Sequence, residues 1–301
     1  MPTNEQRRAT AKRKLERQLE RRAKQARTRR TLVIAGGVIA SLVLIAAVVT
    51  TVVVTRNDHK HDAATATPAT TASGSPATSA PAASTPPVAP LPPFSPSANV
   101  GANCQYPASQ DKAAKAVKPP THTGKIPTDP ATVSVSMATN QGNIGLMLAN
   151  NESPCTVNSF ASLIGQGFFN NTKCHRLTTS ADLAVLQCGD PKGDGTGGPG
   201  YEFANEYPTD QYPPNDPKSQ QPVVYPRGTL AMAHSSQPNS NGSQFFMVYK
   251  DSQLPPDYTV FGKIQDDGLA TLDKIAKAGV AGGGEDGPPA TEVTIKSMLL
   301  D

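Results

Sequence analysis

Three short segments hold the residues whose types and spacing suggest chemistry. They are Cys174-His175-Arg176-Leu177, Gln187-Cys188-Gly189-Asp190 and Asn239-Ser240-Asn241-Gly242-Ser243-Gln244-Phe245-Phe246. An isolated guanidinium, two amide side chains and an apolar slot suit the binding of a peptide at a proline. No acid–base pair and no metal-ligand cluster accompanies these segments in the sequence. The G-x-S-x-G and H-E-x-x-H motifs are also missing, which argues against a hydrolase. Rotation about an amide bond needs none of these groups.

The positive charge of the chain is confined to its N-terminal tail. The formal net charge is +4, yet residues 1–30 hold 12 Lys and Arg against 3 Glu. That tail has an excess of nine positive charges, so the rest of the chain carries a net charge of −5. We predict a basic cytoplasmic tail over residues 1–30 and no binding of nucleic acid by the folded part.

An apolar segment follows the tail. The run from Leu32 to Val54 has no charged residue and is long enough to cross about 30 Å of hydrocarbon as a helix. We predict a single transmembrane helix over residues 31–55; the alternative is a cleaved signal peptide, whose apolar core is usually about 7–15 residues long. Arg27, Arg29 and Arg30 precede the run, so we expect the N-terminus in the cytoplasm and the remainder outside the cell membrane.

A linker and one folded domain are expected after the membrane. Residues 56–103 are rich in Pro, Ala, Ser and Thr, a composition that buries too little apolar surface to fold and predicts a disordered linker. The domain is expected over residues 104–301. All four cysteines lie on the predicted outer side, where disulfides form. Three connectivities are possible, and four unpaired thiols are the alternative.

The periodicity of the domain predicts many short strands and two helices. Residues 132–137 and 144–148 alternate between apolar and other residues around a turn at 140–143, which indicates a hairpin. A helix is expected from Ser153-Pro154 to Gly165, and a second from about Asp267. A last strand is expected around residues 293–296. The pattern therefore favours an all-β barrel whose ends are plugged by helices.

Several ordered motifs carry a family resemblance. They are Asn158-Ser159-Phe160, Cys174-His175-Arg176, Gly195-Thr196-Gly197-Gly198, Phe203-Ala204-Asn205-Glu206, Ala231-Met232-Ala233, Asn241-Gly242-Ser243-Gln244-Phe245-Phe246 and Val260-Phe261-Gly262-Lys263. With them, the chain from about Thr132 to Leu300 resembles the cyclophilins, which are peptidyl-prolyl cis-trans isomerases. The whole architecture resembles a membrane-anchored actinobacterial member. The resemblance implies a closed eight-stranded antiparallel barrel capped by two helices, with neither cofactor nor metal.

The resemblance also implies the roles of individual residues. Arg176 matches the essential arginine, Gln187 the glutamine that supports it, and Phe246 the floor of the proline pocket. The expected substrate-binding residues around them are Val185, Ala233, His234, Gln244, Leu254 and Tyr258. His175 is expected to be structural, because the reaction moves no proton.

The predicted function is isomerisation of X–Pro bonds in extracytoplasmic polypeptides, which assists their folding. The expected partners are proline-containing peptides and unfolded proteins, with the membrane contacted through one transmembrane helix. The alternative is a membrane-tethered module that binds proline peptides with little turnover. Gln253 stands where the family usually has a tryptophan, so tight binding of cyclosporin is not expected. The Pro-rich insertion from Tyr207 to Gln221 has no assigned use.

Overall fold

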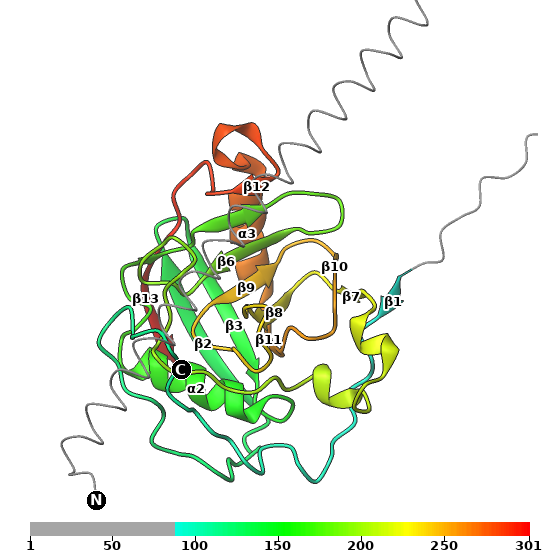
Figure 1. Cartoon of the computed structure of the whole chain (residues 1–301). Coiled ribbons are helices and arrows are strands. Elements are labelled where there is room, and N and C mark those ends of the chain that lie inside the picture. Colours follow the sequence, from blue (N-terminus) through cyan, green and yellow to red (C-terminus); the bar gives the residue numbers. More distant parts are fainter. Residues whose placement is uncertain (1–87) are drawn as a thin grey trace, which may run out of the picture. The chain divides into compact units, whose positions relative to one another are not determined.

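A computed structural model describes residues 88–301 of the chain, whose strands and helices are labelled in Figure 1. The predicted tail, the apolar segment 31–55 and the linker up to residue 87 lie outside the described residues. The predicted fold class placed a membrane-spanning helix before the barrel. Within residues 88–301, no helix combines the length and the apolar character that a membrane crossing requires.

The predicted hairpin is confirmed. Strand β2 (Thr132–Thr139) pairs antiparallel with β3 (Asn143–Ala149), and Met137 lies opposite Ile144. Alternate residues of β3 are buried, among them Leu146 and Leu148. This alternation follows from the period of two in a strand, which sends successive side chains to opposite faces of the sheet.

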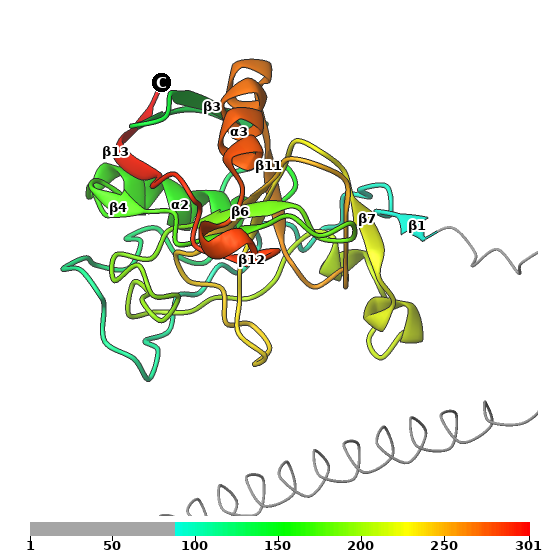
Figure 2. The same cartoon turned by 90° about the horizontal axis from the view of Figure 1, so that it is seen from above.

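Ten strands form one curled sheet. Besides β2 and β3, they are β4 (Thr172–Lys173), β5 (Arg176–Thr178), β6 (Val185–Cys188), β8 (Thr229–Met232), β9 (Phe245–Val248), β11 (Val260–Ile264), β12 (Asp286–Gly287) and β13 (Thr294–Leu300). Their order is β12-β5-β6-β9-β8-β11-β3-β2-β13-β4. Seen from above, the strands curl around a shared interior (Figure 2).

The prediction of a closed eight-stranded barrel is wrong. The ten-stranded sheet has two edges, because its terminal strands β12 and β4 do not pair with each other in the described part of the chain. Both strands are only 2 residues long, and regular pairing of β4 stops before Cys174 and His175. A single bridge between Lys173 and Asp190 links the β4 edge to the residues after β6. The barrel is therefore open.

Both predicted helices are present. Helix α2 (Pro154–Gly165) begins with proline, which has no N–H to leave unsatisfied at a helix start. Its Phe160 packs within the core, with its ring centroid 5.2 Å from that of Phe245 and 4.9 Å from that of Phe261. Helix α3 (Asp266–Ala278) lies against β3 and buries Leu272 and Ile275. Short 3-10 helices span Thr209–Gln211 (η1), Pro217–Gln220 (η2) and Ala281–Gly283 (η3).

A small second sheet lies beside the main one. It contains β1 (Ala89–Pro90), β7 (Val223–Tyr225) and β10 (Ser252–Leu254) in the order β1-β7-β10. Both views place β1 against β7 (Figures 1 and 2). The last residues of the segment predicted as a linker, from 88 onward, therefore contact the domain.

Two disulfides connect the four cysteines. Cys104 is bonded to Cys155 and ties the start of the domain to the first turn of α2. Cys174 is bonded to Cys188 and joins the approach to β5 with the end of β6. The structure therefore shows one of the three disulfide connectivities that the sequence allowed.

Candidate active site

The three residues predicted as catalytic come together in one row across adjacent strands. Arg176 of β5 pairs with Gln187 of β6, and Gln187 pairs with Phe246 of β9. Phe246 in turn pairs with Ala231 of β8. Directly opposed residues point to the same face of a sheet, so the guanidinium, the amide and the aromatic ring share one surface.

The guanidinium of Arg176 is held on two sides. Its Nε and Nη2 donate to Asp286 Oδ1 and Oδ2, both at 2.7 Å. Its Nη1 donates to Gln187 Oε1 at 3.2 Å. The hydrogen bond to Asp286 raises the pKa of Arg176, so the group stays cationic. A guanidinium has five N–H donors; three are engaged, which leaves one on Nη1 and one on Nη2 for a bound peptide.

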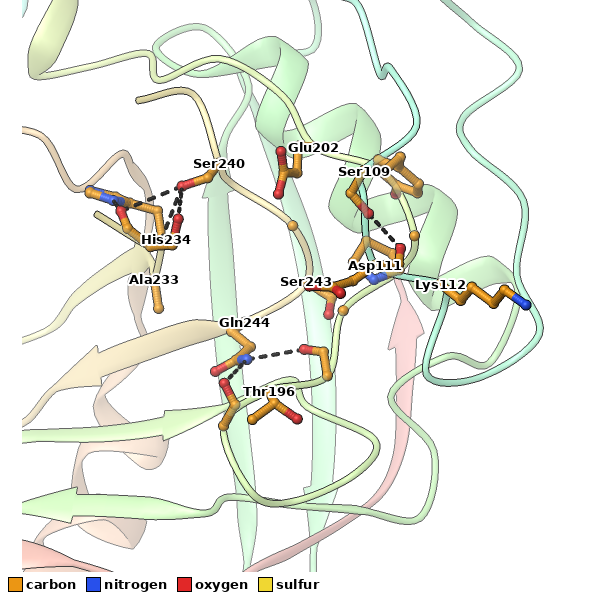
Figure 3. Close-up of a pocket in the computed structure, with 18 of the residues that line it drawn as sticks. Ser109, Asp111, Lys112, Thr196, Glu202, Ala233, His234, Ser240, Ser243 and Gln244 are labelled. Atoms are coloured by element: carbon orange, nitrogen blue, oxygen red, sulfur yellow. Dashed lines mark hydrogen bonds between the residues drawn. The ribbon is translucent and has the colours of Figure 1, made fainter. Parts of the chain in front are cut away.

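A chain of amides continues from the arginine. Gln187 Nε2 donates to Gln244 Oε1 at 2.9 Å. Gln244 Nε2 then donates to the carbonyls of Gly195 at 2.9 Å and Gly197 at 3.0 Å, as drawn in Figure 3. Each amide has one oxygen and one NH₂ group, so this sequence of bonds fixes the orientation of both glutamines. Gln187 therefore presents its oxygen to Arg176.

An apolar cluster lies next to the row. Its buried residues are Val185, Tyr207, Val223, Tyr225, Ala231, Phe246, Val248 and Val260. Ala233, Leu254 and Tyr258 pack against this cluster while remaining partly exposed. Leu183 also packs here. Val185, Phe246, Leu254 and Tyr258, all predicted for the proline pocket, therefore lie in or against one apolar cluster; their role in binding proline stays a prediction.

His234 stacks on Tyr258, which packs against this cluster. Their rings stack with centroids 4.4 Å apart, and the Tyr258 ring meets Phe246 edge-on at 5.7 Å. Burial lowers the pKa of His234, but interactions with Asp257 and with the Ser235 carbonyl raise it more, so the net pKa lies above its ordinary value. His234 Nε2 is 3.7 Å from Asp257 Oδ1, which is an ionic contact rather than a hydrogen bond.

A cavity of about 370 Å³ adjoins the row. Gln187, Gln244, Ala233 and His234 line it, whereas Arg176 and Phe246 do not. Figure 3 shows His234 at the left of the view and Gln244 below it, nearer the centre. Gln187 therefore belongs both to the lining of this cavity and to the row that contains Arg176 and Phe246.

His175 precedes the arginine but is poorly suited to proton transfer. Burial lowers the pKa of its imidazole, which keeps the ring neutral. Neither of its ring nitrogens has a hydrogen-bond partner within residues 88–301. The ring lies close to the loop at Gly195; its structural role stays a prediction.

Asp286 is the functional candidate that the sequence did not reveal. It belongs to β12, which pairs with β5 so that Asp286 lies opposite Thr178. In the sequence it appears as one acidic residue in a glycine-rich stretch, and only the pairing of β12 with β5 brings it to Arg176. Its carboxylate is 56% exposed, and the hydrogen bond from Arg176 lowers its pKa.

The arrangement combines an oriented cation with an apolar cluster around Phe246. The guanidinium can donate to an amide nitrogen that gains a lone pair when the peptide bond twists. Such a donor interacts more strongly with the twisted amide than with the planar one, which is the condition for lowering a barrier.

The chain matches one protein family and several relatives. The model of the family described as "Cyclophilin type peptidyl-prolyl cis-trans isomerase/CLD" matches residues 134–299. "Probable peptidyl-prolyl cis-trans isomerase B" of Mycobacterium leprae (strain TN) is 75% identical over 301 residues, which is 100% of both chains. The protein of that name from Mycobacterium tuberculosis (strain ATCC 25618 / H37Rv) is 74% identical over 301 residues. That match covers 100% of this chain and 95% of the relative.

A solved structure also matches. The crystal structure of a cyclophilin type peptidyl-prolyl cis-trans isomerase of Cryptosporidium parvum has 29% sequence identity and a TM-score of 0.44. The match covers 56% of this chain and 98% of that chain. The same protein, solved in the presence of the dipeptide ala-pro, gives 30% identity and a TM-score of 0.43.

Proposed function

We propose a mechanism and a site of action for this chain from one premise: it belongs to the cyclophilin-type peptidyl-prolyl cis-trans isomerases. Its reaction is rotation about X–Pro peptide bonds. The barrier to that rotation is about 18–20 kcal/mol, because resonance gives the amide partial double-bond character. A proline makes the cis and trans forms close in energy but leaves their exchange slow.

In the proposed mechanism, Arg176 is the catalytic group. The two N–H donors that Asp286 and Gln187 leave free point toward the peptide nitrogen once a proline sits over Phe246. Val185, Leu254 and Tyr258 hold the ring, and Ala233, His234 and Gln244 contact the residues before it. Rotation then proceeds with the nitrogen stabilised by the cation and without proton transfer. The row Arg176–Gln187–Phe246 carries this proposal.

An exchange assay tests the mechanism. Wild type and Arg176→Ala are compared in cis–trans exchange of a short X–Pro peptide, with circular dichroism to verify the fold. We expect Arg176→Ala to lose roughly 100-fold or more in kcat/KM, the size seen when a transition-state donor is removed. Equal rates for the two proteins would exclude Arg176 as the catalytic group, as well as turnover at this site.

The proposed substrates are unfolded polypeptides outside the cytoplasm. Support comes from the two disulfides, Cys104–Cys155 and Cys174–Cys188, because such bonds persist in oxidising compartments.

Attachment to the membrane is proposed from the charge-free sequence 32–54 alone, which lies outside the described residues. Thiol labelling of intact cells with an impermeant reagent, after mild reduction, tests the location: labelling only after lysis would contradict it.

The folding role has its own test. Refolding of a protein whose slow phase is prolyl isomerisation is followed with and without the full chain. We expect the slow phase to accelerate with wild type and not with Arg176→Ala. Acceleration of peptide exchange without acceleration of refolding would restrict the activity to short peptides.

A further inference from the structure

The segment from residue 88 to 95, here called the strap, runs along the outer edge of the small sheet. Its strand β1 pairs parallel with β7, so that Ala89 lies beside Val223 and Pro90 beside Val224. The strap lies outside residues 134–299, the part that matches the family. The family match therefore does not account for the pairing of the strap with the small sheet.

The insertion from Tyr207 to Gln221 holds the strap. The Tyr207 hydroxyl donates to the Pro92 carbonyl at 2.6 Å, and the backbone N–H of Ser95 donates to Gln211 Oε1 at 2.8 Å. The Phe94 ring meets the Tyr207 ring edge-on with centroids 5.6 Å apart. Two polar contacts and one aromatic contact therefore join the insertion to the strap.

The other edge of β7 supports the wall of the proline pocket. There β7 pairs with β10, which places Val223 opposite Leu254 and Tyr225 opposite Ser252. The single O–H of the buried Tyr225 is also shared between the carbonyls of Pro255 and Tyr258, with oxygen–oxygen distances of 3.1 and 3.0 Å. Strand β7 thus positions both Leu254 and Tyr258.

A sheet of this size depends on each of its strands. The strands β1, β7 and β10 have 2, 3 and 3 residues, and such short pairs are marginal in water unless a further strand or an apolar face supports them. The strap supplies both kinds of support, because Leu91 and Phe94 pack on the cluster that contains Phe246.

We propose that the strap is a positioning element of the proline pocket: Phe94 and Tyr207 fix β7, and β7 in turn fixes Leu254 and Tyr258. The proposal rests on the proposed function of that pocket. It follows that the functional unit begins at or before residue 88, and that residues 88–103 are part of the isomerase domain rather than a spacer.

The test uses substitutions in the full chain. Tyr207→Phe keeps the ring and removes the hydrogen bond to Pro92, while Phe94→Ala removes the aromatic contact and Phe94→Tyr should restore it. We expect Phe94→Ala to raise KM for an X–Pro peptide roughly fivefold, the factor that corresponds to about 1 kcal/mol, with kcat nearly unchanged. We expect Tyr207→Phe to give a smaller rise and Phe94→Tyr to behave as wild type.

A second readout separates positioning from general stability. Amide hydrogen exchange should accelerate across residues 252–258 in both Phe94→Ala and Tyr207→Phe, while exchange in β2 and β3 stays slow. Tyr212→Phe is the matched control, because the Tyr212 hydroxyl lies in the same insertion and makes no hydrogen bond within residues 88–301.

The outcomes distinguish the two proposals. An unchanged KM and unchanged exchange at 252–258 in Phe94→Ala, alongside a large loss in Arg176→Ala, would overturn the strap's role and leave the isomerase mechanism intact. If Phe94→Ala fails to fold, the comparison of Tyr207→Phe with Tyr212→Phe tests whether the strap positions the pocket. Equal behaviour of these two variants would contradict the proposal.

Discussion

Arg176 and Asp286 form a two-pronged ion pair, with Nε–Oδ1 and Nη2–Oδ2 distances of 2.7 Å each. The two residues are 110 positions apart in the chain, and the pairing of β12 with β5 brings them together. Both side chains are partly exposed, at 38% and 56%, so the pair adds little to stability. Its effect is geometric, because a bidentate carboxylate fixes the plane of the guanidinium.

Replacing Asp286 should therefore lower activity more than stability. In Asp286→Ala the guanidinium keeps only the bond to Gln187 and samples several orientations. We expect kcat to fall roughly 10-fold, since hydrogen bonds to charged groups contribute about 1.5–3 kcal/mol. The melting temperature should stay within a few degrees of wild type, as expected for an exposed pair. Peptide exchange kinetics and thermal unfolding measure the two effects.

The neighbouring acid provides the control. Glu285 is exposed and its side chain makes no hydrogen bond within residues 88–301, so Glu285→Gln should leave kcat unchanged. Asp286→Asn keeps one acceptor and should lie between wild type and Asp286→Ala. A normal kcat in Asp286→Ala would mean that Gln187 alone orients the arginine.

The amide chain predicts a separate defect. Gln187→Ala removes an acceptor for Arg176 and a donor for Gln244 at once, and Gln244 then loses one of the bonds that orient it. We expect kcat/KM to fall roughly 10-fold, in line with about 1.5 kcal/mol for a hydrogen bond to a charged group. The exchange assay measures this loss, and Gln253→Ala serves as the control, because Gln253 is exposed and bonds to Asp182 instead. Similar rates for Gln187→Ala and wild type would count against the amide chain.

The local elements of the fold were predictable from sequence. Alternation along β2 and β3 and the Ser153-Pro154 helix start are signals within a few residues, and both elements appear where expected. Closure of the barrel was not predictable, because it depends on whether the two edge strands meet. Each edge strand has 2 residues, too few to leave a periodic pattern.

The residues of the candidate site also fall into those that the sequence predicted and those that it did not. Arg176, Gln187 and Phe246 belong to local motifs, and the structure brings them together. Asp286 and the strap act through long-range pairing, which a single sequence does not encode as a pattern. Strict alternation along the strands would point Cys174 and Cys188 to opposite faces, yet the two residues are bonded. Regular pairing stops between β4 and β5, so alternation does not hold there.

The two disulfides should differ in their effect on activity. Cys174–Cys188 flanks the pair Arg176–Gln187, whereas Cys104–Cys155 joins the start of the domain to α2. Their sequence separations are 14 and 51, for which loop-closure entropy gives roughly 3 and 4 kcal/mol of stabilisation. We expect both paired Cys→Ala variants to unfold at lower urea concentration.

Activity at low denaturant then distinguishes the two disulfide variants. The Cys174→Ala/Cys188→Ala variant should lose several-fold in kcat/KM, because the start of β5 is no longer fixed to the end of β6. The Cys104→Ala/Cys155→Ala variant should keep nearly wild-type kinetics. Peptide exchange at a temperature where both variants are folded is the measurement, and equal kinetics would show that the first bond is purely structural.

Glu206 should make stability depend on pH. Its carboxylate accepts from the Cys155 N–H at 3.0 Å and the Thr156 N–H at 2.8 Å, at the start of α2, and from the Thr156 hydroxyl at 2.7 Å. Burial of the carboxylate raises its pKa from 4.5 to about 7, although these donors lower it. A raised pKa means that the folded state binds more protons than the unfolded state between these two values. The contribution of Glu206 to stability is therefore fully present below pH 4.5 and decreases as the pH rises toward 7.

Urea unfolding at pH 4.5 and pH 7.5 measures this dependence. We expect the contribution of Glu206 to fall by about 1–3 kcal/mol between the two conditions, since one pKa unit corresponds to about 1.4 kcal/mol. Glu206→Gln should be less stable than wild type at pH 4.5, because it loses an acceptor for α2, and the difference should narrow at pH 7.5. If the difference instead widens with rising pH, the three donors outweigh burial and Glu206 is ionised in the folded protein.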